Sequence, residues 1–285
     1  MREGRALRAD SSWELTMAGL RSRLSSDVML DTGEVDLSQV QFVRPGGLVG
    51  LSSLIETWSI EDRPLGIKLP PDDVARYMQR MDFFANFGEK LLYDKDVTRL
   101  ESGTRHDDAP LSELRTVRTE DEVAAVTLDF HRLLSKGNLT RSEVNRCCTV
   151  LSEFLENAVI HAESPCGAYT AIQTYQMGGN RVCVAVADAG IGIPATLKVH
   201  REAVSRGIST DGGLIELAAV DGVSRLSADR GGGFGSALRS VGRGNGALTA
   251  WSGQGWVRFS GVVGARAEEA HRFLGTCVEA EFRLS

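Results

Sequence analysis

The order of helical and strand patterns in the second half of the chain leaves few folds open. Two helical stretches, at residues 120–137 and 140–162, come first. Two stretches at 168–176 and 181–188 follow, in which apolar residues alternate with others, and the glycine-containing turn between them predicts a β-hairpin. Helices followed by such strands predict an α/β arrangement in which one layer covers the other.

The patterns near the end of the chain complete the predicted sheet. Stretches at 246–253 and 255–261 predict a second hairpin, and 275–284 predicts a final strand. We therefore expect a C-terminal α/β sandwich with helices on one face of a mostly antiparallel mixed sheet. Thr140 and Glu143 have the spacing of a capping box, so the second helix is expected to begin there.

The first part of the chain is predicted to form a small α/β domain of its own. Short strands and helices alternate there, at 28–30, 40–43, 46–58, 65–70 and 72–84. A polar segment rich in turn formers follows. The expected division is therefore a domain at 1–100, a linker at 101–111 and a second domain at 112–285.

One helical stretch of the second domain carries a polar stripe beside its apolar face. Its apolar residues recur at helical spacing, at Leu151, Phe154, Leu155, Ala158 and Ala162. Steps of four along an α-helix rotate by only about 40°, so Glu153, Asn157 and His161 line up on a neighbouring face. Such a stripe is typical of a solvated surface and also of a helix that faces a ligand.

Composition narrows the classes of partner. The net charge of −6 is unlike the basic character of a general nucleic-acid binder. No apolar run reaches the length of a membrane span, and the first residues lack the apolar core of a signal peptide. The five cysteines lack paired spacing, which favours reduced, buried thiols over a zinc site. We expect a cytoplasmic protein that binds neither nucleic acid nor membrane.

A glycine-containing motif follows the strand at 181–188. It consists of Asp188, Gly190 and Gly192. A carboxylate beside a backbone with little side-chain bulk can accept a hydrogen bond from the amino group of a flat aromatic ligand. An ordinary Asp-Gly turn has the same sequence, so this motif alone leaves both interpretations open.

A second glycine motif, Gly231, Gly233 and Gly235, stands just before a helix. Backbone N–H groups exposed at a helix N-terminus favour an anion such as phosphate, although a flexible loop can have the same composition. No strand pattern precedes these glycines, which excludes the dinucleotide-binding motif. Gly275 and Thr276 open the final strand and carry little information by themselves.

Taken in order, these four motifs resemble the ATP-binding domain of the GHKL superfamily, which includes gyrase, a class of heat-shock chaperones, histidine kinases and mismatch-repair ATPases. The resemblance covers about residues 112–285. It implies ATP and Mg²⁺ as cofactors, with Asn157 as the Mg²⁺ ligand. It also makes Glu153 the carboxylate that orients or deprotonates an attacking water or hydroxyl. The polar stripe would then face a nucleotide.

The same resemblance assigns groups to the base and the phosphates. Asp188 would bind the adenine amino group with help from Thr276, while Gly190 and Gly192 would make room for the ring. A mobile lid at 197–235 would contain the glycines that cradle the phosphates. These are Gly231, Gly233 and Gly235.

Three residues and the end of the chain bear on the branch of the superfamily. His161 and Arg230 are either phosphate contacts or ordinary capping or surface residues, and His131 is expected to be an ordinary helix residue. The chain ends directly after the last motif, so the transducer domain of gyrase-like proteins is not expected. The helices before the first motif resemble those of the stand-alone anti-sigma serine kinases.

The N-terminal part resembles a STAS domain, the fold of anti-sigma antagonists, over about residues 28–85. In those antagonists a phosphorylated serine stands where the central helix begins. Here the corresponding residues 44–48 read Arg-Pro-Gly-Gly-Leu and contain no hydroxyl. We therefore expect a degenerate STAS-like docking domain that is not phosphorylated at this position.

The sequence thus predicts a regulator of bacterial type that binds Mg·ATP and acts on a partner protein, by phosphorylating serine or threonine or by slow ATP hydrolysis. The expected partner is a sigma factor, an anti-sigma antagonist-like protein or another regulator, and a homodimer is left open. The alternatives are a non-catalytic nucleotide sensor or a scaffold whose lid and STAS-like domain control partner binding.

Overall fold

The structure, a computed structural model, describes most of the chain. The described residues are 12–24, 34–58, 64–88, 90–100, 111–175, 180–223, 233–243, 245–260 and 263–284. All statements below concern these residues.

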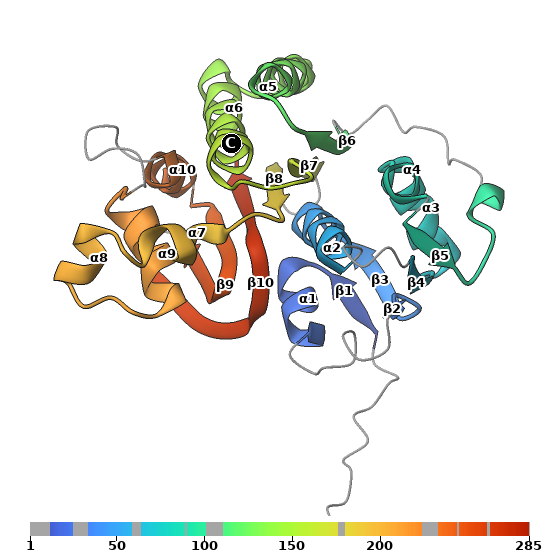
Figure 1. Ribbon diagram of the computed structural model, residues 1–285. Helices are drawn as coiled ribbons and strands as arrows, with labels where there is room; N and C mark the ends of the chain where they lie inside the picture. Colours follow the sequence, from blue (N-terminus) through green and yellow to red (C-terminus); the bar gives the residue numbers. More distant parts are fainter. Residues whose placement is uncertain are drawn as a thin grey trace, which may run out of the picture.

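A five-stranded sheet forms the centre of the molecule (Figure 1). In spatial order its strands are β6 (Leu111–Val117), β7 (Ala168–Tyr175), β8 (Arg181–Asp188), β10 (Val263–Arg283) and β9 (Ala247–Ser260). Every pairing between them is antiparallel. The expected α/β class, the antiparallel sheet and the hairpin of β7 and β8 are therefore confirmed.

The second expected hairpin, with its turn near Gly253, is wrong. Residues 247–260 form one continuous strand, and its partner is β10. Gly253 has a φ of 57°, and the pairing register shifts beside it, between Glu269 and Phe273 and between Phe273 and Thr276. A glycine with positive φ allows a strand to bend at a bulge without ending, which is why the pattern resembled a turn.

Helices cover one face of the sheet, as the sequence predicts. They are α5 (Glu120–Ser135), α6 (Arg141–Glu156), α9 (Asp211–Val220) and α10 (Gly233–Gly242). Their apolar residues form one core with the residues of β7, β8, β9 and β10 that point to this side. The predicted capping box of Thr140 and Glu143 is present at the start of α6, and α5 has a second one at Thr119 and Glu122.

The N-terminal part is built from short parallel strand pairs and helices. Its elements are β1 (Trp13–Leu15), α1 (Met17–Leu24), β2 (Glu34–Asp36), β3 (Val40–Val43), α2 (Pro45–Trp58), β4 (Leu65–Lys68), α3 (Asp72–Arg80), α4 (Phe83–Phe87), β5 (Leu91–Tyr93) and the 3₁₀ turn η2 (Val97–Arg99). β1 pairs with β3, and β4 lies between β2 and β5. The helix expected at 72–84 is broken by Asp82, whose φ of 58° is left-handed. The strand expected at 28–30 lies outside the described residues.

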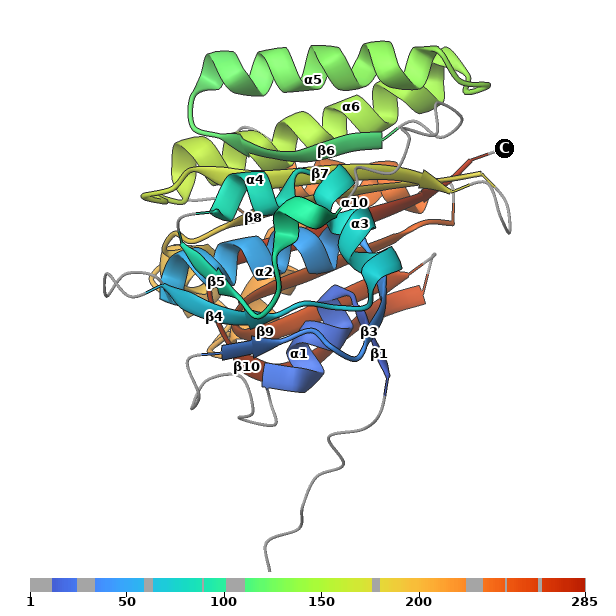
Figure 2. The ribbon, with the colours of Figure 1, turned by 90° about the vertical axis from the view of Figure 1, so that its right-hand side faces the viewer.

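Helix α2 covers the other face of the central sheet, where it contacts β7, β8 and β10 (Figures 1 and 2). Every residue from 45 through 55 is buried, because the helix has the sheet on one side and the N-terminal elements on the other. Tyr169, Ala185, Trp251 and Cys277 point to this face of the sheet and share a core with the N-terminal part. The two parts of the chain therefore share an apolar core across the sheet.

The five cysteines are buried and free of disulfides, as expected for reduced thiols. Within the described residues, no helix has the length and apolar character that a membrane span requires.

Candidate functional site

Asp188, the last residue of β8, is a buried carboxylate at the edge of the helix-covered face. It is only 3% exposed. Its Oδ1 atom accepts a hydrogen bond of 2.8 Å from the backbone N–H of Gly190, and its carboxylate also accepts from the N–H of Thr276. Burial nevertheless raises the pKa of Asp188 to about 7, against the lowering effect of both N–H groups. A hydrogen-bond donor on a ligand would stabilise its charged form.

Thr276 lies directly opposite Asp188 in the pairing of β8 with β10. The preceding Gly275 has a φ of 87°, and a Cβ atom there would lie 2.8 Å from the Oδ1 atom of Asp188. Glycine is therefore required at position 275 for two reasons: the positive φ of its backbone and the lack of space for a side chain beside the Asp188 carboxylate. The family resemblance implies that Thr276 assists Asp188 at the adenine, and the strand register places the two residues opposite each other.

Ser252 on β9 belongs to the same cluster, and the sequence analysis missed it. Its hydroxyl donates to the carbonyl of Gly275 at 2.7 Å and lies 3.2 Å from the Oγ1 atom of Thr276. It also accepts the N–H of Ile193 at 3.0 Å. A lone serine within a strand pattern gives no signal of such a role, because its partners Gly275, Thr276 and Ile193 are 23, 24 and 59 residues away in the chain.

Gly190 and Gly192 are required by close backbone packing around the loop after β8. A Cβ atom on Gly190 would collide with the carbonyl of Ala162, which accepts the N–H of Ile191 at 2.8 Å. Gly192 has a φ of 78°, and its Cβ would lie 2.7 Å from the hydroxyl of Ser252. Gly190 thus lets the loop after β8 pack on Ala162 at the end of the first motif helix, and Gly192 lets it pack on Ser252 and Gly275. The expected role of Gly190 and Gly192 in making room for adenine stays a prediction.

The polar stripe begins on α6 and continues into a turn of π-helix, η3 (Asn157–His161). The sequence predicts an ordinary α-helix here. In a π-helix a step of four residues falls just short of a full turn, so His161 stays on the side of Asn157. Turns of this kind are frequent at functional sites. The side chain of Asn157 is half-buried and makes no hydrogen bond within the described part of the chain.

Glu153 lies one turn before Asn157 and beside the start of α10. A Cβ atom on Gly233 would collide with the carboxylate of Glu153, so the glycine at this position permits the contact. Burial raises the pKa of Glu153, and the charge of Glu156 raises it further. The rings of Phe154 and Phe234, whose centroids are 6.0 Å apart, pack α6 against α10 at this point.

Gly235, the other residue of the second glycine motif that the structure describes, packs against the end of α9. A Cβ there would lie 3.3 Å from the carbonyl of Ala219 and from the Cα of Gly222. Arg230 and Gly231, the other two residues predicted to contact phosphate, lie outside the described residues.

The lid expected at 197–235 needs correction. The lid would begin at the last residue of α7 (Gly192–Leu197), and its first part contains α8 (Arg201–Ser205) and α9. Helix α9 packs against β9, and Leu214, Ile215 and Leu217 belong to the core. A helix that is buried in this way cannot swing open without exposing the core, so a lid that includes residues 211–220 is not supported.

The donor set fits a nucleotide with its magnesium ion. Mg²⁺ takes oxygen ligands, retains several waters and is usually bound through one or two protein groups together with substrate phosphates. The amide oxygen of Asn157 is such a group. Asp188 supplies an acceptor for an exocyclic amino group, and the N-terminus of α10, next to Glu153, supplies backbone N–H groups for phosphate.

Comparison with known proteins finds a family match over one part of the chain. Residues 116–239 match the family described as the histidine kinase-like ATPase domain. Over these residues the chain is similar to a histidine kinase-like ATPase domain of the GHKL type. The match spans the first three predicted motifs, whereas Gly275 and Thr276 lie beyond it. The match does not extend to the N-terminal part, so the STAS-like resemblance stays a prediction.

Two solved structures are similar to part of the chain. One is the histidine kinase domain from the Erythrobacter litoralis EL346 blue-light activated histidine kinase, with 16% identity over 58% of this chain and 60% of that one, at a TM-score of 0.30. The other is the mycobacterial sensor histidine kinase MprB, with 17% identity over 57% of this chain and 93% of that one, at a TM-score of 0.29. This chain thus spans less than two thirds of the first structure. No curated protein matches it.

Proposed function

We propose that the ATPase-like part of this chain binds Mg·ATP and uses it to signal to a partner protein. The observation that carries the proposal is the buried carboxylate of Asp188, which receives two backbone N–H groups and retains acceptor capacity for an adenine amino group. A guanine would present a carbonyl at the same place, so the site should discriminate against GTP.

Asn157 and Glu153 then face the phosphates. Asn157 is the residue that would hold Mg²⁺, and the ion would neutralise phosphate charge during phosphoryl transfer. Glu153, whose pKa is raised by burial and by Glu156, would accept the proton of an attacking water or hydroxyl. The N–H groups at the start of α10 would cradle the phosphate oxygens.

The proposed activity is phosphorylation of serine or threonine on a partner, or slow hydrolysis. A non-catalytic sensor uses the same binding residues without turnover, and a scaffold uses none of them. In each case the N-terminal part, the proposed STAS-like docking module, would meet the partner: a sigma factor, an anti-sigma antagonist-like protein or another regulator. The acidic net charge of −6 makes a protein a more suitable partner than nucleic acid.

Calorimetry with the full chain tests the binding proposal. Mg·ATP should bind and Mg·GTP should not bind measurably. A hydrogen bond to a charged group contributes about 1.5–3 kcal/mol, so Asp188→Asn should weaken ATP binding by about one to two decades. Equal affinities for ATP and GTP would contradict the assignment of Asp188 to adenine.

A further inference from the structure

Helix α2 from the N-terminal part reaches the backbone of the candidate base-recognition residue. The hydroxyl of Ser53 donates to the carbonyl oxygen of Asp188 at 2.8 Å. Ser53 is fully buried, and its partner is 135 residues away in the chain. The contact therefore joins the two parts of the molecule at the strand end that carries the Asp188 carboxylate.

The same helix also contacts the strand opposite Asp188. The Sγ atom of Cys277, the residue after Thr276, lies 3.7 Å from the carbonyl of Gly46. A Cβ atom on Gly50 would lie 3.4 Å from the same sulfur. Small residues on the helix thus let α2 pack closely on β8 and β10 where the paired site residues Asp188 and Thr276 stand.

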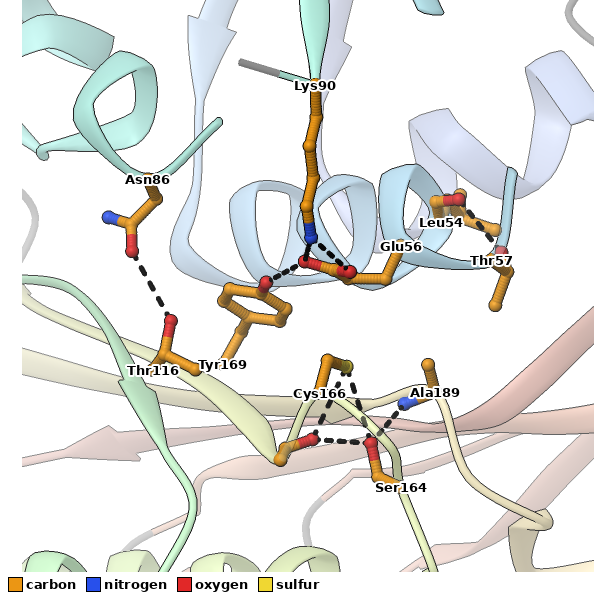
Figure 3. Close-up of polar contacts among 11 residues, drawn as sticks. Leu54, Glu56, Thr57, Asn86, Lys90, Thr116, Ser164, Cys166, Tyr169 and Ala189 are labelled. Carbon is orange, nitrogen blue, oxygen red and sulfur yellow. Dashed lines mark hydrogen bonds and ion pairs between the residues drawn. The ribbon is translucent and has the colours of Figure 1, made fainter. Parts of the chain in front are cut away.

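The peptide that follows Asp188 is held by a second serine. The N–H of Ala189 donates to the hydroxyl of Ser164 at 3.3 Å, and that hydroxyl donates to the carbonyl of Gly167 at 2.6 Å (Figure 3). Ser53 and Ser164 come from different parts of the chain and bind the two polar atoms of the same peptide group, the carbonyl of Asp188 and the N–H of Ala189. The planar peptide that follows the Asp188 side chain is therefore held at both its acceptor and its donor.

Further along α2, polar contacts fasten the helix to the sheet. The hydroxyl of Tyr169 on β7 donates to the carboxylate of Glu56, which also accepts from Lys90 at 2.6 Å and 2.7 Å (Figure 3). These contacts fix the position of the helix one turn beyond Ser53. The geometry of the Ser53 hydroxyl is therefore set by both neighbouring turns of a buried helix.

We propose that Ser53 is a positioning residue for nucleotide recognition, because its hydroxyl fixes the peptide of Asp188 and with it the direction of the carboxylate. The inference rests on the proposed function of Asp188. It makes the N-terminal part a component of the nucleotide site, so that docking of α2 and binding of the base favour each other. Linkage requires this coupling to be reciprocal.

Ser52 provides a matched control on the same helix. It is also fully buried, but its hydroxyl donates at 2.8 Å to the carbonyl of Leu48, within α2 itself. Ser52→Ala and Ser53→Ala each remove one buried hydroxyl, and both should lower the melting temperature to a similar degree. Only Ser53→Ala should disturb Asp188.

The test is calorimetry on the full chain with adenosine and with Mg·ATP. Ser53→Ala should weaken both ligands equally, by roughly three- to tenfold, because the defect lies at the base. Ser52→Ala should leave both affinities within about twofold of the parent, since its bond is not part of the site. In the Asp188→Asn background, Ser53→Ala should have almost no further effect, because residues that act through one another are not additive.

The outcomes separate the inference from the function on which it rests. If the parent chain binds neither adenosine nor Mg·ATP, both the proposed function and the positioning role of Ser53 are overturned. A parent that binds, together with a Ser53→Ala variant of unchanged affinity, overturns the positioning role alone. Equal losses in Ser52→Ala and Ser53→Ala would also overturn it, because they would reveal general damage to α2. If Ser53→Ala does not fold, Ser53→Cys keeps the size with a weaker donor and should give a smaller loss of the same kind.

Discussion

The backbone N–H of Gly46 donates to a carboxylate oxygen of Glu279 at 2.9 Å, which joins the first turn of α2 to the middle of β10. Glu279 is half-buried, and desolvation raises its pKa although Arg44 and the Gly46 N–H act in the opposite direction. The carboxylate thus stands at the N-terminus of a helix, where the helix dipole favours negative charge. The Arg-Pro-Gly-Gly-Leu segment therefore serves as a docking point between the two parts of the chain.

This contact predicts that Gly46→Ala destabilises the protein. The new Cβ would lie 2.5 Å from the Glu279 oxygen and 2.9 Å from the Cγ of Met17. Overpacking of this kind costs about 1–3 kcal/mol, measurable as a lower midpoint in urea unfolding. Gly242→Ala is the control, because a Cβ there meets no atom within 4 Å. Equal midpoints for the two variants would mean that the interface adjusts without strain.

A shared core predicts that residues 112–285 do not fold well alone. Trp251, Tyr169, Phe273 and Cys277 are buried against the N-terminal part, and its removal would expose them as an apolar patch. We expect the truncated chain to bind a hydrophobic dye and to melt at a lower temperature than the full chain, and co-expression with residues 1–100 to reverse both effects. A truncated chain that melts like the full one would show that the sheet is stable without α2.

The amide of Asn157, which has no hydrogen-bond partner among the described residues, predicts a metal-dependent loss of affinity. Asn157→Ala should weaken Mg·ATP binding strongly and leave adenosine binding nearly unchanged, because adenosine has no phosphate for the ion to bridge. Calorimetry with both ligands, with and without Mg²⁺, measures the difference. Equal losses for both ligands would instead indicate that Asn157 supports the π-helical turn.

The raised pKa of Asp188 predicts that base binding depends on pH near neutrality. Burial raises this pKa to about 7, so the carboxyl is largely protonated at pH 6 and largely charged at pH 8. An amino group binds the charged form better, and adenosine affinity should therefore fall by roughly tenfold from pH 8 to pH 6. Adenosine is the suitable ligand because it carries no phosphate to titrate. Asp188→Asn should remove the dependence, and a slope that persists in this variant would assign it to another group.

Substitution of Glu153 distinguishes a catalytic protein from a non-catalytic nucleotide sensor. Glu153→Gln should keep Mg·ATP affinity within a few-fold or tighten it, because a carboxylate beside a triphosphate is repulsive. Turnover should fall by about two decades or more, the usual contribution of a general base. Glu156→Gln is the comparison variant: Glu156 is exposed and accepts from Ser152, and its charge only raises the pKa of Glu153, so this variant should change turnover far less than Glu153→Gln. If the parent chain shows no turnover, either alone or with its partner, the non-catalytic sensor is supported. If both variants lose turnover, the cause is the negative charge of the helix rather than Glu153 itself.

Local sequence patterns determined much of the C-terminal fold, because they encode interactions between near neighbours. The capping box of Thr140 and Glu143 lies within one turn of chain, and the alternation over 181–188 reports the two faces of a single strand. The same is true of the spacing of Glu153 and Asn157. The pairing of Asp188 with Thr276 came from a resemblance between motifs, and the strand register then provided its physical basis.

The tertiary structure alone decided what depends on distant contacts. Gly253 looked like a turn because a glycine pattern cannot distinguish a bend from a reversal, and only pairing with β10 made β9 continuous. Neither Ser252 nor Ser53 could be predicted as part of the site, since a buried hydroxyl acquires its role from an acceptor far away in the chain. The pattern over 46–58 predicted a helix, but not that α2 is buried between the N-terminal elements and the ATPase-like sheet. Long-range packing decides such partners, and sequence periodicity does not encode them.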